Sequence, residues 1–283
     1  MHFIFYDFTL KNAPLFRHAS AFDIIGAFFS WCYGDIHKPL CRAVGDRMRQ
    51  GGLIIGDMCA MIDTMKIKMK AGETMKYIFL HGMGQNSSCW DKVLSCMSEK
   101  TEAECPELSV FCKDGECLYG RMYAAFSEYC GSFGEPVVLC GLSLGAVLAL
   151  NYAIDHPNCV SALILIAPQY KMPKKMLKFQ NFLFRFMPEK QFADIGVKKN
   201  DFISLTNSMA DIDMTCGLDK VKCPTLVLCG ERDNVNKKSA EQLSEKLCNS
   251  KSGIIKNAGH EANKDAPKEL AEMIENFING DVK

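Results

Sequence analysis

The chain has 283 residues, of which 48% are hydrophobic and 23% are charged, and its 33 basic side chains balance its 33 acidic ones. A disordered chain would be poorer in apolar residues, and a nucleic-acid binder would normally carry a basic excess, so this composition excludes both classes of protein. The length is sufficient for one large α/β domain, which is the organisation that we expect.

Residues 1–74 show no sustained hydrophobic period. They could form an accessory helical segment or a partner-binding arm. We favour a different hypothesis, in which translation begins naturally at Met75 and residues 1–74 are a poorly ordered extension that contributes nothing to the fold. The codons for Ala71-Gly72-Glu73, immediately ahead of Met75, can form a purine-rich stretch that resembles a bacterial ribosome-binding site.

The first residues show no export or membrane signal. The start at Met1–Asp7 lacks the basic stretch of a secretory signal, and the apolar run Ala19–Tyr33 contains Asp23 and is too short to span a bilayer. We therefore expect a cytoplasmic protein without stable membrane insertion.

Cysteine is abundant, with 15 residues, and the odd number leaves at least one thiol unpaired. The sequence has no Cys-x-x-Cys pair, and Cys112 and Cys117 have no histidine close to them, which argues against a structural zinc site. We expect the cysteines to be reduced packing residues of an intracellular protein.

From residue 75 onward, short apolar runs alternate with longer amphipathic stretches. The runs typical of strands buried on both faces are Tyr77–Leu80, Val137–Cys140, Ala162–Ile166 and Thr225–Cys229, with Gly253–Lys256 as a weaker fifth. Helical spacing of apolar residues predicts helices around residues 118–129, 243–247 and 270–277. This alternation predicts a mostly parallel sheet flanked by helices, with functional groups at the carboxyl ends of the strands.

The segment His81-Gly82-Met83-Gly84 follows the first predicted strand. A serine that attacks a carbonyl creates an oxyanion, which is stabilised by preorganised donors such as backbone N–H groups. We expect the amides of Met83 and Leu144 to form this oxyanion hole. Taken alone, the segment favours an ordinary glycine-containing strand-to-helix turn.

The strongest signal is Gly141-Leu142-Ser143-Leu144-Gly145, between the strand Val137–Cys140 and the helix that follows it. A nucleophile on a sharp strand-to-helix turn needs small neighbours, because larger side chains would clash in its strained backbone. We therefore predict that Ser143 is a nucleophile at the amino end of a helix whose dipole favours negative charge. The alternative is an ordinary serine N-cap between two glycines.

An acid and a base follow the later strands. Asp233 comes after Thr225–Cys229, and His260 comes after Gly253–Lys256. A neutral imidazole can take the serine proton, and a buried carboxylate can fix the imidazole tautomer, so we predict a triad of Ser143, Asp233 and His260. The weaker rivals for these roles are His81, His156, Asp211, Asp213 and Glu231.

Residues 76–280 resemble the α/β-hydrolase superfamily, particularly its small single-domain bacterial serine hydrolases, which are esterase-like. The matching segments are His81–Gly84 with Trp90 downstream, Cys105–Leu108 after an expected strand, Gly141–Gly145, Ala167-Pro168, the Asp233 segment and Gly259-His260. The order of serine, acid and histidine is also the order of that superfamily. Its members often have two additional strands at the start, and residues 1–74 show no clear version of them.

The resemblance implies that residues 169–217 are a small helical cap inserted in the domain 75–283. Within the cap, most of the charged residues are basic. Apolar residues recur there at helical spacing, namely Phe179, Phe182, Leu183, Phe186 and Met187. The apolar face could line an acyl pocket, and the basic face could attract anionic substrates or lipid headgroups. For the charges, we favour solvated lysines on the outside of a helix that packs on the domain.

These features predict a serine hydrolase that cleaves a carboxylic ester or related acyl bond of a small, partly apolar substrate through an acyl-enzyme. This chemistry requires no metal or organic cofactor, and the expected partner is a small-molecule acyl substrate rather than nucleic acid. Two alternatives stay open because this fold hosts many chemistries. One is a lyase or acyltransferase that uses the same triad, and the other is a ligand receptor with little turnover.

Overall fold

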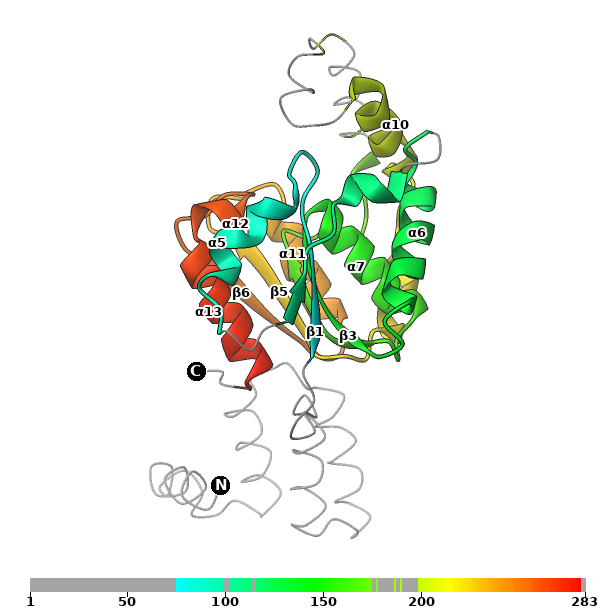
Figure 1. Cartoon of the computed structure of the whole chain (residues 1–283). Coiled ribbons are helices and arrows are strands. Elements are labelled where there is room, and N and C mark those ends of the chain that lie inside the picture. Colours follow the sequence, from blue (N-terminus) through cyan, green and yellow to red (C-terminus); the bar gives the residue numbers. More distant parts are fainter. Residues whose placement is uncertain are drawn as a thin grey trace, which may run out of the picture. The chain divides into compact units, whose positions relative to one another are not determined.

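The computed structural model of the chain describes residues 75–98, 102–112, 116–174, 177, 186, 189 and 198–280 (Figure 1). The hypothesis about residues 1–74 falls outside these ranges. So does the central part of the predicted cap, with four of the five apolar residues that define its helix. Within the described ranges, no helix combines the length and the apolar character needed to cross a membrane.

A six-stranded sheet with the order β2-β1-β3-β4-β5-β6 forms the centre of the domain. Its strands are β1 (Lys76–Leu80), β2 (Glu102–Glu104), β3 (Val137–Leu142), β4 (Val160–Ile166), β5 (Thr225–Gly230) and β6 (Ser250–Ile255). All neighbouring strands run parallel. The predicted parallel α/β sheet is confirmed, and each of the five predicted strands overlaps an observed one.

Helices cover both faces of the sheet (Figure 1). One face carries α6 (Tyr119–Gly131), α7 (Leu144–Asp155) and α11 (Lys237–Lys246), and the other carries α5 (Asp91–Leu94), α12 (Ala262–Asp265) and α13 (Pro267–Ile278). Strand side chains alternate between the two cores, as a period of two requires. In β1, Ile78 and Leu80 pack with α7, whereas Tyr77 and Phe79 pack with α13.

The remaining elements are the short 3-10 helices η2 (Ser87–Trp90), η3 (Leu108–Cys112) and η4 (Thr215–Lys220), and the helix α10 (Lys199–Met209). Helix α10 belongs to the predicted cap and lies next to the start of α6. The backbone N–H of Tyr119 donates to Ser208 Oγ (2.8 Å), and this hydroxyl donates to the carbonyl of Leu205 (2.7 Å). The first bond joins α6 to α10, and the second lies within α10.

Strand β2 stands at the edge of the sheet and consists of Glu102, Ala103 and Glu104. It pairs with β1, where Lys76 Nζ lies 3.0 Å from Glu102 and 3.3 Å from Glu104. The strand expected before Cys105 from the resemblance is therefore present. Charged residues on an edge strand keep it from pairing with another chain.

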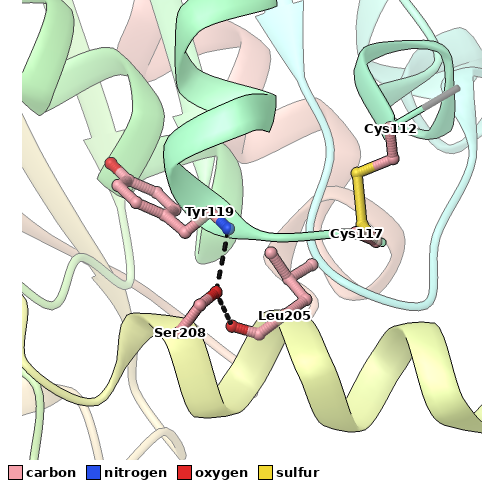
Figure 2. Close-up of a disulfide and its surroundings, with 5 residues drawn as sticks. All are labelled: Cys112, Cys117, Tyr119, Leu205 and Ser208. Atoms are coloured by element: carbon pink, nitrogen blue, oxygen red, sulfur yellow. Dashed lines mark hydrogen bonds between the residues drawn. A yellow bond between two sulfur atoms is a disulfide. The ribbon is translucent and has the colours of Figure 1, made fainter. Parts of the chain in front are cut away.

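A disulfide joins Cys112, at the end of η3, to Cys117, just before α6 (Figure 2). The expectation that the cysteines are reduced packing residues is wrong for this pair. Their Cα atoms lie 5.0 Å apart, which is within the range that a disulfide spans. The other ten cysteines in the described ranges are free.

Two glycines mark places where backbone segments approach too closely for a side chain. A Cβ at Gly145, in the first turn of α7, would lie 2.2 Å from the carbonyl oxygen of Leu80 in β1. A Cβ at Gly141 would lie 2.3 Å from the carbonyl oxygen of Gly145. The absence of a side chain at these positions therefore allows β1, β3 and the start of α7 to pack together.

The variant Gly145→Ala should lose about 3 kcal/mol or more of unfolding free energy, the upper range for overpacking, because its methyl group would overlap the Leu80 carbonyl. The matched control is Gly131→Ala at the end of α6, where an added Cβ meets no atom within 4 Å. Alanine favours a helix over glycine, so this control should gain up to about 1 kcal/mol. Urea denaturation measures both, and equal stability of the two variants would contradict the close packing of α7 on β1.

Candidate active site

Ser143 lies on the sharp turn between β3 and α7. Its φ of 54° and ψ of −110° are costly for a residue with a side chain. Hydrogen bonds hold the turn on both sides, because the Ser143 N–H donates to the Ile166 carbonyl (2.9 Å) and its carbonyl accepts from the Val147 N–H (3.0 Å). Ser143 occupies the N-cap position of α7, but its side chain makes no capping hydrogen bond. The interpretation as an ordinary serine N-cap is therefore wrong.

The hydroxyl of Ser143 instead faces His260. Ser143 Oγ lies 3.0 Å from His260 Nε2, and His260 Nδ1 lies 2.8 Å from Asp233 Oδ2. The three residues follow β3, β5 and β6, whose carboxyl ends share one edge of the sheet. The structure brings together the serine, acid and base that the sequence predicts, in one hydrogen-bonded line.

Asp233 is buried, with 5% of its surface exposed, and a neighbouring amide satisfies its carboxylate. The backbone N–H of Asn236 donates to Oδ1 (3.2 Å), and its Nδ2 reaches Oδ1 (2.9 Å) and Oδ2 (2.8 Å). Burial by itself would raise the pKa of Asp233, but the hydrogen bonds from His260 and Asn236 outweigh burial and hold the pKa below its ordinary value. The carboxylate is therefore ionised at neutral pH.

Asn236 is in turn held by Gln169, whose Nε2 donates to Asn236 Oδ1 (2.7 Å). Gln169 follows β4, so a second polar side chain from a different loop supports the acid. Neither residue was predicted from the sequence. A signal for Asn236 exists in the sequence, since an amide three residues after an aspartate can donate back to the carboxylate.

The loops of the acid and the base lie against each other. A Cβ at Gly230, just before the acid loop, would come within 2.1 Å of the Gly259 carbonyl oxygen. The backbone N–H of Arg232 donates to the Ala258 carbonyl (2.8 Å), and Asp265 Oδ2 accepts from the Gly259 N–H (2.7 Å). These backbone contacts set the distance between Asp233 and His260.

His81 supports the turn after β1 rather than acting on Ser143. Its Nε2 accepts a hydrogen bond from the Leu108 N–H (3.1 Å), so its Nδ1 carries the proton and donates to the Gly82 carbonyl (2.8 Å). Burial lowers the pKa of His81 below its ordinary value, in spite of the nearby Glu107. A neutral His81 therefore links the turn at Gly82 to the segment after β2.

The other rivals for the acid and base have structural partners. The ring of His156, at the end of α7, lies 3.0 Å from Ser127 Oγ. Asp211 and Asp213 are paired with lysines, and Glu231 accepts from the Asn257 N–H (2.9 Å). Each of these side chains therefore has a structural partner, which explains its presence without a catalytic role.

A pocket of about 310 Å³ lies over Ser143 and His260. Met83 and Leu144, whose amides are the predicted oxyanion donors, line the same pocket. Most of its other lining residues are apolar, and the rest are neutral and polar: Val147, Met172, Pro173, Leu177, Phe202, Met209 and Val235, with Gln169, Thr206 and Asn236. Its walls come partly from α10 and the start of the predicted cap.

The thiols of Cys89 in η2 and Cys229 in β5 are poor rivals of the serine. Burial raises the pKa of Cys89 and of Cys229 to about 12, so both stay protonated at neutral pH. Among the side chains that the structure describes, no three or more His, Cys, Asp or Glu residues are grouped in a way that could hold a metal ion.

Comparison with known proteins places these features in a wider context. The profile of the serine aminopeptidase S33 family matches residues 82–215. Monoacylglycerol lipase ABHD6 of Mus musculus is 23% identical over 58% of this chain and 53% of its own length. The pimeloyl-[acyl-carrier protein] methyl ester esterase of Aeromonas hydrophila is 24% identical over 73% of this chain and 96% of its own length. A solved thermophilic esterase from Thermogutta terrifontis superposes with a TM-score of 0.63 at 19% identity, over 74% of this chain and 91% of that one.

The depressed pKa of Asp233 predicts an acid-sensitive contribution to stability. This contribution is present above the ordinary pKa of 3.8 and is lost as the pH falls through the lower, folded-state pKa. The advantage of the wild type over Asp233→Asn in unfolding free energy should therefore shrink between about pH 5 and about pH 2.

Urea titrations at each pH measure this difference, with Asp219→Asn as the control at an exposed carboxylate outside the site. A difference between wild type and Asp233→Asn that stays constant over this pH range would contradict the favourable hydrogen bonding of the carboxylate.

Proposed function

The chain belongs to the α/β-hydrolase superfamily, and from this premise we propose that it is a serine hydrolase that cleaves a carboxylic ester or related acyl bond. The observation that carries the proposal is the hydrogen-bonded line from Asp233 through His260 to Ser143. A serine at its free pKa is a weak nucleophile, and an adjacent imidazole oriented by a carboxylate is the arrangement that activates it.

In the proposed reaction, Ser143 Oγ attacks the substrate carbonyl while His260 Nε2 takes the hydroxyl proton. The charge that develops on the carbonyl oxygen is met by the amides of Met83 and Leu144, which border the pocket. His260 then gives its proton to the leaving alcohol, and the acyl-enzyme forms. Water then attacks the acyl group while the same imidazole takes its proton. His260 returns this proton to Ser143 Oγ as the acyl–serine bond breaks, which releases the acid and free Ser143. Asp233 accepts the hydrogen bond from His260 Nδ1–H and stabilises the imidazolium during both the formation and the hydrolysis of the acyl-enzyme.

The proposed substrate is a small, partly apolar acyl compound. The pocket over Ser143 has a mostly apolar lining and, with a volume of about 310 Å³, lies at the small end of ligand pockets. The curated relatives named above are a lipase and a methyl ester esterase, which supports ester cleavage by this chain.

The variant Ser143→Ala tests the nucleophile. It should lower p-nitrophenyl ester turnover by roughly 10⁴-fold or more and abolish fluorophosphonate labelling, because it removes the hydroxyl that lies against His260. The control is Ser132→Ala, which removes an exposed hydroxyl bonded to the Tyr129 carbonyl and should keep full activity. Unchanged labelling of Ser143→Ala would refute the assignment.

The pocket predicts a preference for short acyl chains. A butyryl or hexanoyl group fits within a cavity of this size, whereas a palmitoyl chain must extend beyond the described walls. In a series of p-nitrophenyl esters measured below their micelle concentrations, kcat/KM should peak at short or medium chains. A steady rise of kcat/KM up to palmitate would contradict the proposed substrate class.

A further inference from the structure

A polar contact joins the turn after β1 to the segment that follows His260. Gln85 Nε2 donates to Glu261 Oε1 (2.7 Å) and to Asn263 Oδ1 (3.2 Å). Gln85 Oε1 accepts from the backbone N–H of Gly82 (3.1 Å). Gln85 therefore spans from the predicted oxyanion turn to the residue next to the predicted base.

A backbone hydrogen bond and the His81 side chain also hold this turn. The Gly82 carbonyl accepts from the Gln85 N–H (3.2 Å) and from His81 Nδ1 (2.8 Å). Gly82 C=O and Met83 N–H belong to one trans peptide plane, in which the two groups point in opposite directions. Holding the Gly82 carbonyl therefore fixes the direction of the Met83 N–H.

Asn263 anchors this contact from the other side. It is fully buried, and its Nδ2 reaches the Cys89 carbonyl (3.3 Å) and Gln85 Oε1 (3.4 Å). A buried amide that loses its partners incurs a desolvation penalty, so Asn263 has a strong preference for this one arrangement. It lies in α12, three residues after His260, and therefore links the position of the base to that of Gln85.

We propose that Gln85 and Asn263 are positioning residues that hold the Met83 amide at a set place relative to His260 and Ser143. The proposal rests on the proposed serine hydrolase function and adds two residues outside the triad and the oxyanion donors. Their role is indirect, because neither residue lines the pocket over Ser143. Gln85 and Asn263 affect catalysis through the position of the oxyanion donor, and reaction rates are very sensitive to that position.

The first test is Gln85→Met, which keeps the length of the side chain and removes its hydrogen bonds. With p-nitrophenyl butyrate, kcat should fall roughly 10- to 100-fold while KM changes by less than about twofold, as expected for a misplaced transition-state donor. Inhibition by an alkyl trifluoromethyl ketone, which forms a tetrahedral oxyanion adduct with serine, should weaken by the same factor as kcat/KM. The control is Ser88→Ala, which removes a hydroxyl bonded to Asn86 from the same segment and should leave all values unchanged.

A purely structural role makes a different prediction for Gln85→Met: a lower melting temperature with an unchanged kcat. That result, or a lower kcat with unchanged affinity for the trifluoromethyl ketone, would overturn the proposal. If the wild-type enzyme shows no ester turnover, or turnover that Ser143→Ala does not lower, the proposed function itself is refuted. The two failures are therefore distinguishable.

An exchange of partners provides the second test and does not depend on Gln85→Met folding. Gln85→Glu places a carboxylate against the carboxylate of Glu261 and should lower kcat at least as much as Gln85→Met. Adding Glu261→Gln restores one donor facing one acceptor, with the roles exchanged and the net charge unchanged. The double variant should recover most of the wild-type kcat, and no recovery in a folded double variant would contradict the proposal.

Discussion

The site depends on two close approaches between backbone segments, each at a glycine where no side chain would fit. Gly145 brings the start of α7 against β1, and Gly230 brings the acid loop against the loop of His260, with distances to a hypothetical Cβ of 2.2 and 2.1 Å. The first contact places the Ser143 turn beside the turn at Met83, and the second places Asp233 within reach of His260. The short distances between Ser143, His260 and Asp233 follow from how the backbone is packed.

Several polar side chains of the site depend on that packing, because Asp233, Asn236 and His81 are buried together with their hydrogen-bond partners. Asp233 stays ionised in a buried position through Asn236 and His260, and Asn236 is held by Gln169. On the other side of the serine, the His81 side chain donates to the Gly82 carbonyl, and the Gln85 side chain accepts from the Gly82 N–H. Supporting hydrogen bonds of this kind keep reacting groups in one geometry and exclude competing ones.

The sequence predicted the parts of the fold whose signal is local. Strands β1, β3, β4 and β5 are buried on both faces and read as continuous apolar runs, whereas β6 gave a weaker signal because Lys251 and Ser252 are exposed. The proximity of Ser143, Asp233 and His260 could be expected from the sequence, because Ser143 directly follows β3 and the other two residues lie in the loops after β5 and β6. Gln85 and Asn263 have no such signature, because their partners lie 178 residues apart and only the fold brings them together. The Cys112–Cys117 pairing was missed for a different reason, since spacing among 15 cysteines does not identify which of them pair.

In the proposed reaction, Ser143 carries an acyl group between the two halves. Rapid mixing of the enzyme with an excess of p-nitrophenyl butyrate, followed by acid quenching and peptide mass mapping, tests this claim directly. We expect a burst of p-nitrophenol close to one equivalent per chain, continued turnover, and a butyryl adduct on the peptide that contains Ser143. Product formation without a covalent adduct, or with the adduct on another residue, would contradict this claim.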